Sequence, residues 1–183
     1  VGSAATLVPP PHAPPLGDPV PTPMSVVQEF PAPPAAVYAL LTDREFLTGR
    51  LADCGGVDPE IVALQVDDGT ATVTTRQAIP ASVLPPMVAT LMAGNPVTER
   101  TESWHADGDG YIADFSVTVK GAPASLKGTM ALAPAPNGST LTVQGNAAVP
   151  IPMFGGKIEE VIASQIGELL QLEGDYTRGQ LAG

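Results

Sequence analysis

Strand-and-turn repetition between residues 60 and 149 limits most strongly how this chain can fold. Segments of alternating apolar and polar residues are separated by turn-forming sequences such as Asp67-Asp68-Gly69 and Pro136-Asn137-Gly138. Asp-Gly and Asn-Gly pairs favour tight hairpins because they accept positive φ angles. Alternation of period two with one apolar face indicates a half-buried strand. The pattern therefore predicts about six antiparallel strands, joined largely as a meander.

The last three of these strands show which residues should face inward. Four of those residues are small, which predicts room on the concave face and favours an open cavity over a filled one. The small residues are Ala113, Gly128, Gly145 and Ala147. Their larger inward-facing neighbours are Tyr111, Phe115, Val117, Leu126, Met130, Leu132, Leu141 and Val143.

The hydrophobic period changes after residue 153. Apolar residues at three- and four-residue spacing predict an amphipathic helix of about twenty residues, roughly 30 Å long. Such a helix can lie across a sheet of ten-residue strands, which are roughly 34 Å long. The expected apolar stripe is Phe154, Ile158, Val161, Ile162, Gln165, Ile166, Leu169, Leu172 and Tyr176, and the expected polar face is Lys157, Glu159, Glu160, Glu168 and Glu173.

The region before the meander predicts one strand and two short helices. Residues 25–30 form the expected strand, and Pro33-Pro34 suits a first helical turn. The sequence Thr42-Asp43-Arg44-Glu45 predicts a capping box with Thr42 as the cap. Gly55-Gly56 predicts a left-handed helix stop. Residues 1–23 contain eight prolines, so we expect a Pro-rich arm or linker ahead of one domain over 24–183, or alternatively a polyproline ligand for a partner.

Two segments resemble a known superfamily. Residues 30–43, with the sequence FPAPPAAVYALLTD, resemble the opening strand–helix junction of START-like (helix-grip, SRPBCC) proteins, which include lipid-transfer domains and polyketide cyclases. Residues 152–159, PMFGGKIE, resemble the turn into the last helix in an uncharacterised family of domains from high-GC bacteria. The resemblance covers about residues 24–180. It implies an α+β helix-grip fold, with a curved antiparallel sheet of about seven strands wrapped on the long C-terminal helix, two short helices after the first strand, and an apolar cavity.

Residues 80–96 depart from the tight hairpin that is common at this point in the superfamily. A short apolar helix is predicted there, either as a lid over the cavity mouth or as ordinary packing at the sheet end. The expected ligand-binding residues are Met87, Leu91, Met92, Trp104, Tyr111, Phe115, Val117, Met130, Leu132, Phe154, Ile158 and Ile162. Arg76 and Arg100 are possible polar anchors for a carboxylate ligand, or cross-strand partners of acidic neighbours.

No catalytic group, cofactor or metal site is predicted. His105 and Glu99 share a strand face but lie roughly 20 Å apart, and His105 precedes an exposed turn. Cys54 has no histidine near it in the sequence. One cysteine and two histidines cannot form a Cys/His zinc cluster.

The net charge of −11 narrows the range of partners. Nucleic acids and anionic membrane surfaces both attract clustered Lys and Arg, which this chain lacks. No apolar run approaches the ~18 residues of a membrane span, so no membrane insertion is expected. The single cysteine fits a reducing compartment, and we expect a cytoplasmic location. The oligomeric state stays open.

These features favour a non-enzymatic carrier or sensor of a lipid-like or polyketide-like hydrophobic small molecule, which predicts an apolar cavity with at most one or two polar groups. One alternative is a cyclase- or hydratase-like enzyme on the same fold, which requires at least two polar side chains converging inside with shifted pKa values. Another is a protein-interaction module with a filled core and an exposed apolar patch.

Overall fold

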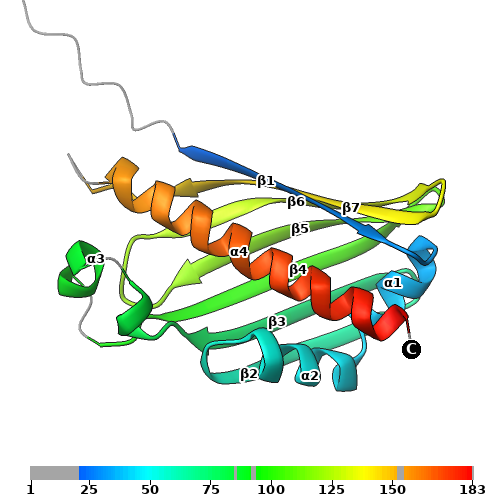
Figure 1. The fold of residues 1–183 in the computed structure, drawn as a ribbon, viewed down its shortest axis with the longest axis horizontal. Helices are drawn as coiled ribbons and strands as arrows, with labels where there is room; N and C mark the ends of the chain where they lie inside the picture. The colour runs from blue at the N-terminus through cyan, green and yellow to red at the C-terminus, as the bar shows by residue number, and fades with distance from the viewer. Residues whose placement is uncertain (1–20, 85, 92–93, 152–154, 183) are drawn as a thin grey trace, which may run out of the picture.

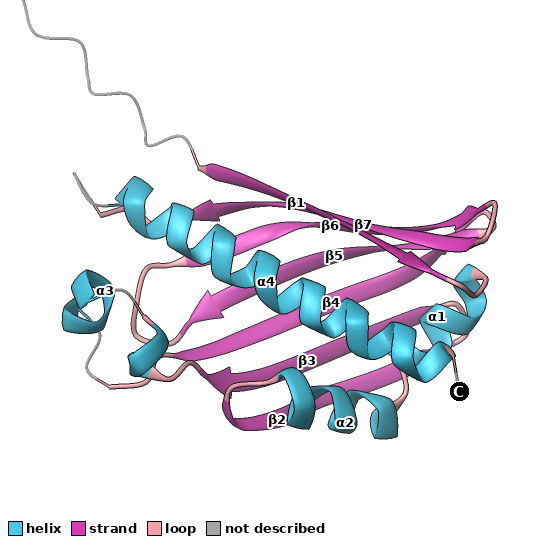
Figure 2. Ribbon diagram, viewed as in Figure 1, coloured by secondary structure: helices cyan, strands magenta, loops and turns pink. Residues whose placement is uncertain are grey.

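The chain forms one curved, seven-stranded antiparallel sheet that wraps around a long C-terminal helix (Figures 1 and 2). The computed structural model describes residues 21–84, 86–91, 94–151 and 155–182, without the side chains of residues 83, 87, 88 and 91. The strand order is β1-β7-β6-β5-β4-β3-β2. The strands are β1 (Thr22–Phe30), β2 (Val57–Asp67), β3 (Thr70–Ala78), β4 (Val97–Asp107), β5 (Gly110–Val119), β6 (Ser125–Ala135) and β7 (Gly138–Ala148). The helices are α1 (Pro34–Leu41), α2 (Arg44–Cys54), the 3₁₀ turn η1 (Ala81–Val83), α3 (Pro86–Leu91) and α4 (Gly155–Leu181).

The predicted architecture is confirmed: one strand, two short helices, six further strands and a long last helix. Tight turns join β2 to β3 and β4 to β5, where Gly69 and Gly108 adopt φ angles of 76° and 57°. The short helix α3 lies within the segment where the sequence departs from a hairpin. None of the described helices is both long and apolar enough to cross a bilayer.

The caps of α2 differ from the prediction. Asp43, rather than Thr42, is the N-cap, because its carboxylate accepts a 2.8 Å hydrogen bond from the backbone N–H of Phe46. The Thr42 hydroxyl instead donates to the Tyr38 carbonyl at the end of α1. Gly55 ends α2 with a φ of −76°, so the prediction of a left-handed conformation at this helix end is wrong. The N–H of Gly55 still donates to the Leu51 carbonyl.

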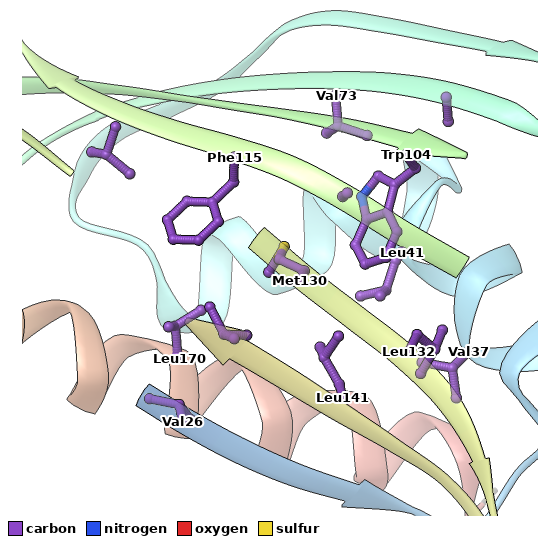
Figure 3. Close-up of a cluster of buried hydrophobic side chains, with 14 of the residues drawn as sticks. Val26, Val37, Leu41, Val73, Trp104, Phe115, Met130, Leu132, Leu141 and Leu170 are labelled. Atoms are coloured by element: carbon purple, nitrogen blue, oxygen red, sulfur yellow. The ribbon is translucent and has the colours of Figure 1, made fainter. Parts of the chain in front are cut away.

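The concave face of the sheet carries the core, and Figure 3 shows side chains from β5, β6 and β7 meeting Leu170 of α4. Phe115 pairs across the ladder with Gly128, which pairs with Gly145. A Cβ atom on Gly145 would lie 3.0 Å from the Cζ atom of the Phe115 ring. Gly145, one of the small inward-facing residues predicted from sequence, therefore accommodates this ring, and the space above it is not empty.

α4 crosses the concave side of the sheet, with β1, β7 and α2 as its main packing partners (Figure 1). It has 27 residues, more than the length predicted. Its buried face also differs: Glu159 and Glu173 are 2% and 8% exposed, whereas Leu172 is 55% exposed. Both carboxylates were expected on the polar face, and each is buried because it has dedicated partners. Glu159 accepts from the Val149 N–H at 2.7 Å and from the Thr22 hydroxyl at 3.1 Å.

Candidate functional site

Four charged side chains meet beneath α4, and we call them the charged centre: Arg50 of α2, Arg100 and Glu102 of β4, and Glu173 of α4. Three of them, Arg50, Glu102 and Glu173, are 5%, 3% and 8% exposed. The side chain of Arg100 is 14% exposed. Arg100 and Glu102 point inward because alternate residues of a strand share a face, and Trp104 follows on that same face.

Arg100 holds the centre together by contacting both carboxylates. Its Nη2 lies 2.6 Å from Oε1 of Glu102, and its Nη1 donates to Oε2 of Glu173 at 2.9 Å. The other oxygen of Glu102 accepts from the indole N–H of Trp104 at 2.8 Å. On α2, Nη1 of Arg50 lies 3.9 Å from Oε2 of Glu173.

The pKa shifts indicate that Arg100 and Glu173 are both charged at neutral pH. Burial by itself would lower the pKa of Arg100, but the neighbouring Glu102 and Glu173 outweigh it and raise that pKa above its ordinary value. Burial would likewise raise the pKa of Glu173, but Arg100 and Arg50 outweigh it and hold that pKa below its ordinary range. The ion pair therefore persists inside the protein.

A pocket and a separate, smaller cavity both border the Arg100–Glu173 pair. The pocket has a volume of about 30 Å³ and the smaller cavity about 10 Å³. The pocket is lined by Leu51, Thr75, Gln77, Thr98, Arg100, Phe115, Val117, Met130, Val143, Ile166, Leu169, Leu170 and Glu173. About 30 Å³ is room for one or two water molecules, whereas small-molecule sites typically measure about 300–1,000 Å³. The pocket is thus nearly closed in this structure.

Comparison with known proteins places the chain in a family. Residues 25–181 match the family described as "Protein of unknown function (DUF2505)". The chain belongs to the DUF2505 family. It is 31% identical to the uncharacterized protein Rv0481c of Mycobacterium tuberculosis over 149 residues, which cover 77% of this chain and 86% of that protein. An uncharacterized protein of Mycobacterium bovis, Mb0491c, matches at the same identity and coverage.

Solved structures show that this DUF2505 chain has the START-like helix-grip fold. A Thermus thermophilus protein, TTHA0849, superposes with a TM-score of 0.60 at 18% identity, over 88% of this chain and 97% of that one. The Zhui aromatase/cyclase of a Streptomyces species gives 0.54 at 10% identity, over 88% and 92%. A START superfamily protein from Mycobacterium smegmatis gives 0.52 at 12% identity, over 87% and 97%. At these identities the likeness shows the fold alone.

The structure brings some of the expected ligand-binding residues of this DUF2505 chain together and not others. Phe115, Val117, Met130 and Arg100 line the pocket, and Trp104 borders the smaller cavity. Four others line neither, namely Tyr111, Leu132, Ile158 and Ile162. Tyr111 and Leu132 instead line a separate hollow of about 270 Å³ beside the β4–β5 turn. Tyr111 stacks on Tyr38 with ring centroids 3.9 Å apart. Met92 and Phe154 lie outside the described residues, as do the side chains of Met87 and Leu91, so the lid stays a proposal.

The Arg76 side chain does not point into the space between the sheet and α4, where a carboxylate anchor was considered. Its neighbours Thr75 and Gln77 line the pocket, so strand alternation puts Arg76 on the opposite face of the sheet. There it pairs with Glu99 at 2.7 Å and Glu60 at 2.5 Å, which is the cross-strand alternative. His105 is exposed, and within the described part of the chain no three His, Cys, Asp or Glu residues are grouped to hold a metal ion.

Sequence reasoning missed Arg50 and Glu173 as members of the site. Glu173 follows Leu170 by three residues and so shares its helix face, but a helical stripe drawn from apolar residues alone leaves an acidic residue out. Arg50 sits between Leu47 and Leu51, both buried, in α2. The signal that could have identified both residues is that each lies within the apolar stripe of its helix. A charged side chain buried in such a stripe requires an opposite charge facing it.

Proposed function

We propose that the chain binds a hydrophobic small molecule between the sheet and α4, with the charged centre at one end of the binding pocket. The observation that carries this proposal is the pocket itself: apolar side chains from α2, β5, β6, β7 and α4 surround a gap that ends at Arg100 and Glu173. An apolar wall with a few convergent polar groups is the usual composition of a small-molecule site.

Ligand entry requires the pocket to widen, because about 30 Å³ is roughly a tenth of the smallest typical ligand site. Ile166 and Leu169 on α4 are only partly buried, so they can swing toward solvent without leaving a well-packed core. The conformation described here is then the closed form of the pocket.

The test is native mass spectrometry of protein purified from its own organism, followed by lipid extraction. We expect a co-purified hydrophobe at about one per chain. Leu169→Trp, which fills the pocket, should lose it, whereas Leu172→Trp should keep it because Leu172 lies three residues away on the same helix and is 55% exposed. A clean apo mass, with no thermal shift across fatty acids, sterols and aromatic polyketides, would refute the proposal and favour an interaction module with a filled core.

A second candidate function, a cyclase- or hydratase-like enzyme, is favoured by the convergence of four charged side chains beside the pocket. Against it, Glu173 is a weak proton acceptor because Arg100 and Arg50 hold its pKa low despite its burial. The two candidates differ in the fate of the ligand. If the protein is an enzyme, the mass of a compound incubated with it changes by loss or gain of water, and Glu173→Gln abolishes the change; a carrier returns the compound unaltered.

A further inference from the structure

The charged centre is balanced in charge. Two guanidinium groups, Arg50 and Arg100, face two carboxylates, Glu102 and Glu173, and all four lie within one buried cluster. Both oxygens of Glu102 face donors, one from Arg100 and one from Trp104, so this carboxyl group already accepts at each oxygen. A further buried charge at this point would have no counter-charge.

The groups that remain at the pocket wall suit an uncharged acceptor. The rest of its polar lining comes from Thr75, Thr98 and Gln77. The Thr98 hydroxyl already donates to the Gln77 backbone carbonyl at 3.1 Å, so the donors at the wall are the Thr75 hydroxyl and the Gln77 amide. The amide oxygen of Gln77 accepts from the Gly56 N–H at 2.9 Å, which fixes the orientation of the amide. Within the described residues, Nε of Arg50 is buried without a hydrogen-bond partner, but it belongs to the smaller cavity and not to the pocket wall. With its oxygen used by Gly56, the Gln77 amide offers the pocket its N–H groups, beside the hydroxyl of Thr75.

An anionic ligand would meet an arginine that already faces two carboxylates. To pair with Arg100 it must either lie as a third negative charge beside Glu102 and Glu173, or push away Glu102, which Trp104 also holds, or Glu173, whose other cationic neighbour is Arg50 at 3.9 Å. In each case three buried negative charges would face two guanidinium groups, which is a costly arrangement. A ketone, ester or alcohol oxygen can accept a hydrogen bond at the pocket wall and leave both ion pairs intact.

We propose that the pocket selects apolar molecules whose polar group is an uncharged hydrogen-bond acceptor, such as a ketone, ester or alcohol, and discriminates against carboxylates and phosphates of the same carbon skeleton. This proposal rests on the proposed function, because it specifies the ligand of the same pocket. It assigns Arg100 the task of holding the centre in its neutral arrangement, rather than that of an anchor for a carboxylate.

The experiment compares matched ligands on the whole chain at pH 7 by isothermal titration calorimetry. One series is decanoic acid against decan-2-one and 1-decanol; a second is 2-naphthoic acid against methyl 2-naphthyl ketone. We expect the neutral members to bind at least about tenfold more tightly than the acids. Acids that bind as tightly as the neutral members would overturn this inference but leave the proposed function standing. Absence of binding in both series, by contrast, would refute the proposed function and this inference with it.

Glu173→Gln tests the cause of the selectivity. It gives the centre one net positive charge while keeping the shape of the side chain, so the preference should shift toward the acids by about tenfold or more. Glu168→Gln removes a charge from the exposed face of the same helix and should leave the preference unchanged. An unchanged preference in folded Glu173→Gln would overturn the charge-balance argument. If that variant does not fold, the comparison of matched ligands on the wild-type protein still decides the proposal.

Discussion

Replacing Arg100 by methionine tests how strongly the charged centre is coupled to folding. The change removes the ion pairs at 2.6 Å and 2.9 Å and leaves Glu102 and Glu173 buried. Glu102 then keeps only the indole N–H of Trp104, and Glu173 keeps Arg50 at 3.9 Å. Breaking a buried ion pair by removing one partner costs about 3–5 kcal/mol. With an m-value of about 2 kcal/mol/M in urea, the unfolding midpoint should fall by about 1.5–2.5 M.

The assay is urea unfolding followed by the fluorescence of Trp104, the only tryptophan, and by circular dichroism as an independent probe. Arg76→Met is the matched control, because Arg76 also contacts two carboxylates but has a side chain 41% exposed on the opposite face. Its midpoint should stay close to that of the wild type. Adding Glu173→Leu to Arg100→Met should recover part of the loss, through a coupling of about 0.5–3 kcal/mol. A midpoint shift for Arg100→Met no larger than that for Arg76→Met would refute the idea that the centre is a buried cluster held together by Arg100.

Two further predictions concern acid stability and core packing. Although burial alone would raise the pKa of Glu173, Arg100 and Arg50 hold that pKa below its ordinary value of about 4.5. The stabilisation that ionised Glu173 gives the folded state is therefore complete above about pH 4.5, and it is lost as the pH falls through the lower pKa of the folded state. Urea unfolding of the wild type and Glu173→Gln between about pH 3 and 7 should therefore show a shallower acid limb in the variant; parallel limbs would contradict this. Phe115→Ala should lower the free energy of unfolding by about 3–5 kcal/mol, because it leaves a cavity where the ring packs against Gly145. A loss of less than about 1 kcal/mol would mean that the ring is not packed there.

The order of elements could be predicted because each depends on local patterns. Alternation along residues 111–120 identifies β5, and the Asp-Gly and Asn-Gly pairs mark the hairpins. One error occurs where two local signals compete at adjacent residues. Thr42 and Asp43 are both favourable N-cap residues. Asp43 takes the role in α2, because the Thr42 hydroxyl donates to the Tyr38 carbonyl in the last turn of α1.

The side-chain contacts between the sheet and α4 were harder to predict because they join elements far apart in sequence. Arg100 and Glu173 are separated by 73 residues, and nothing local in either segment signals their pairing. The same holds for Phe115, whose ring occupies the space that Gly145 was expected to leave empty. Sequence reasoning could place Arg100, Glu102 and Trp104 on one strand face, but not name the helical residue opposite them.

The attachment of α4 has a mechanical consequence. Glu159 fastens the helix near one end, to the backbone of Val149, and Glu173 fastens it near the other, fourteen residues or about 21 Å away. Gly167 lies between them, and a Cβ atom there would have its nearest neighbour 4.0 Å away, at Val26. The side-chain amide of Gln28 on β1 also donates to the Leu170 carbonyl, so the span that can bow lies between Glu159 and Leu170. A helical glycine lowers the resistance to bending, so a bow of this span at Gly167 would lift the pocket-lining residue Ile166 while the helix stays attached at Glu159, Leu170 and Glu173.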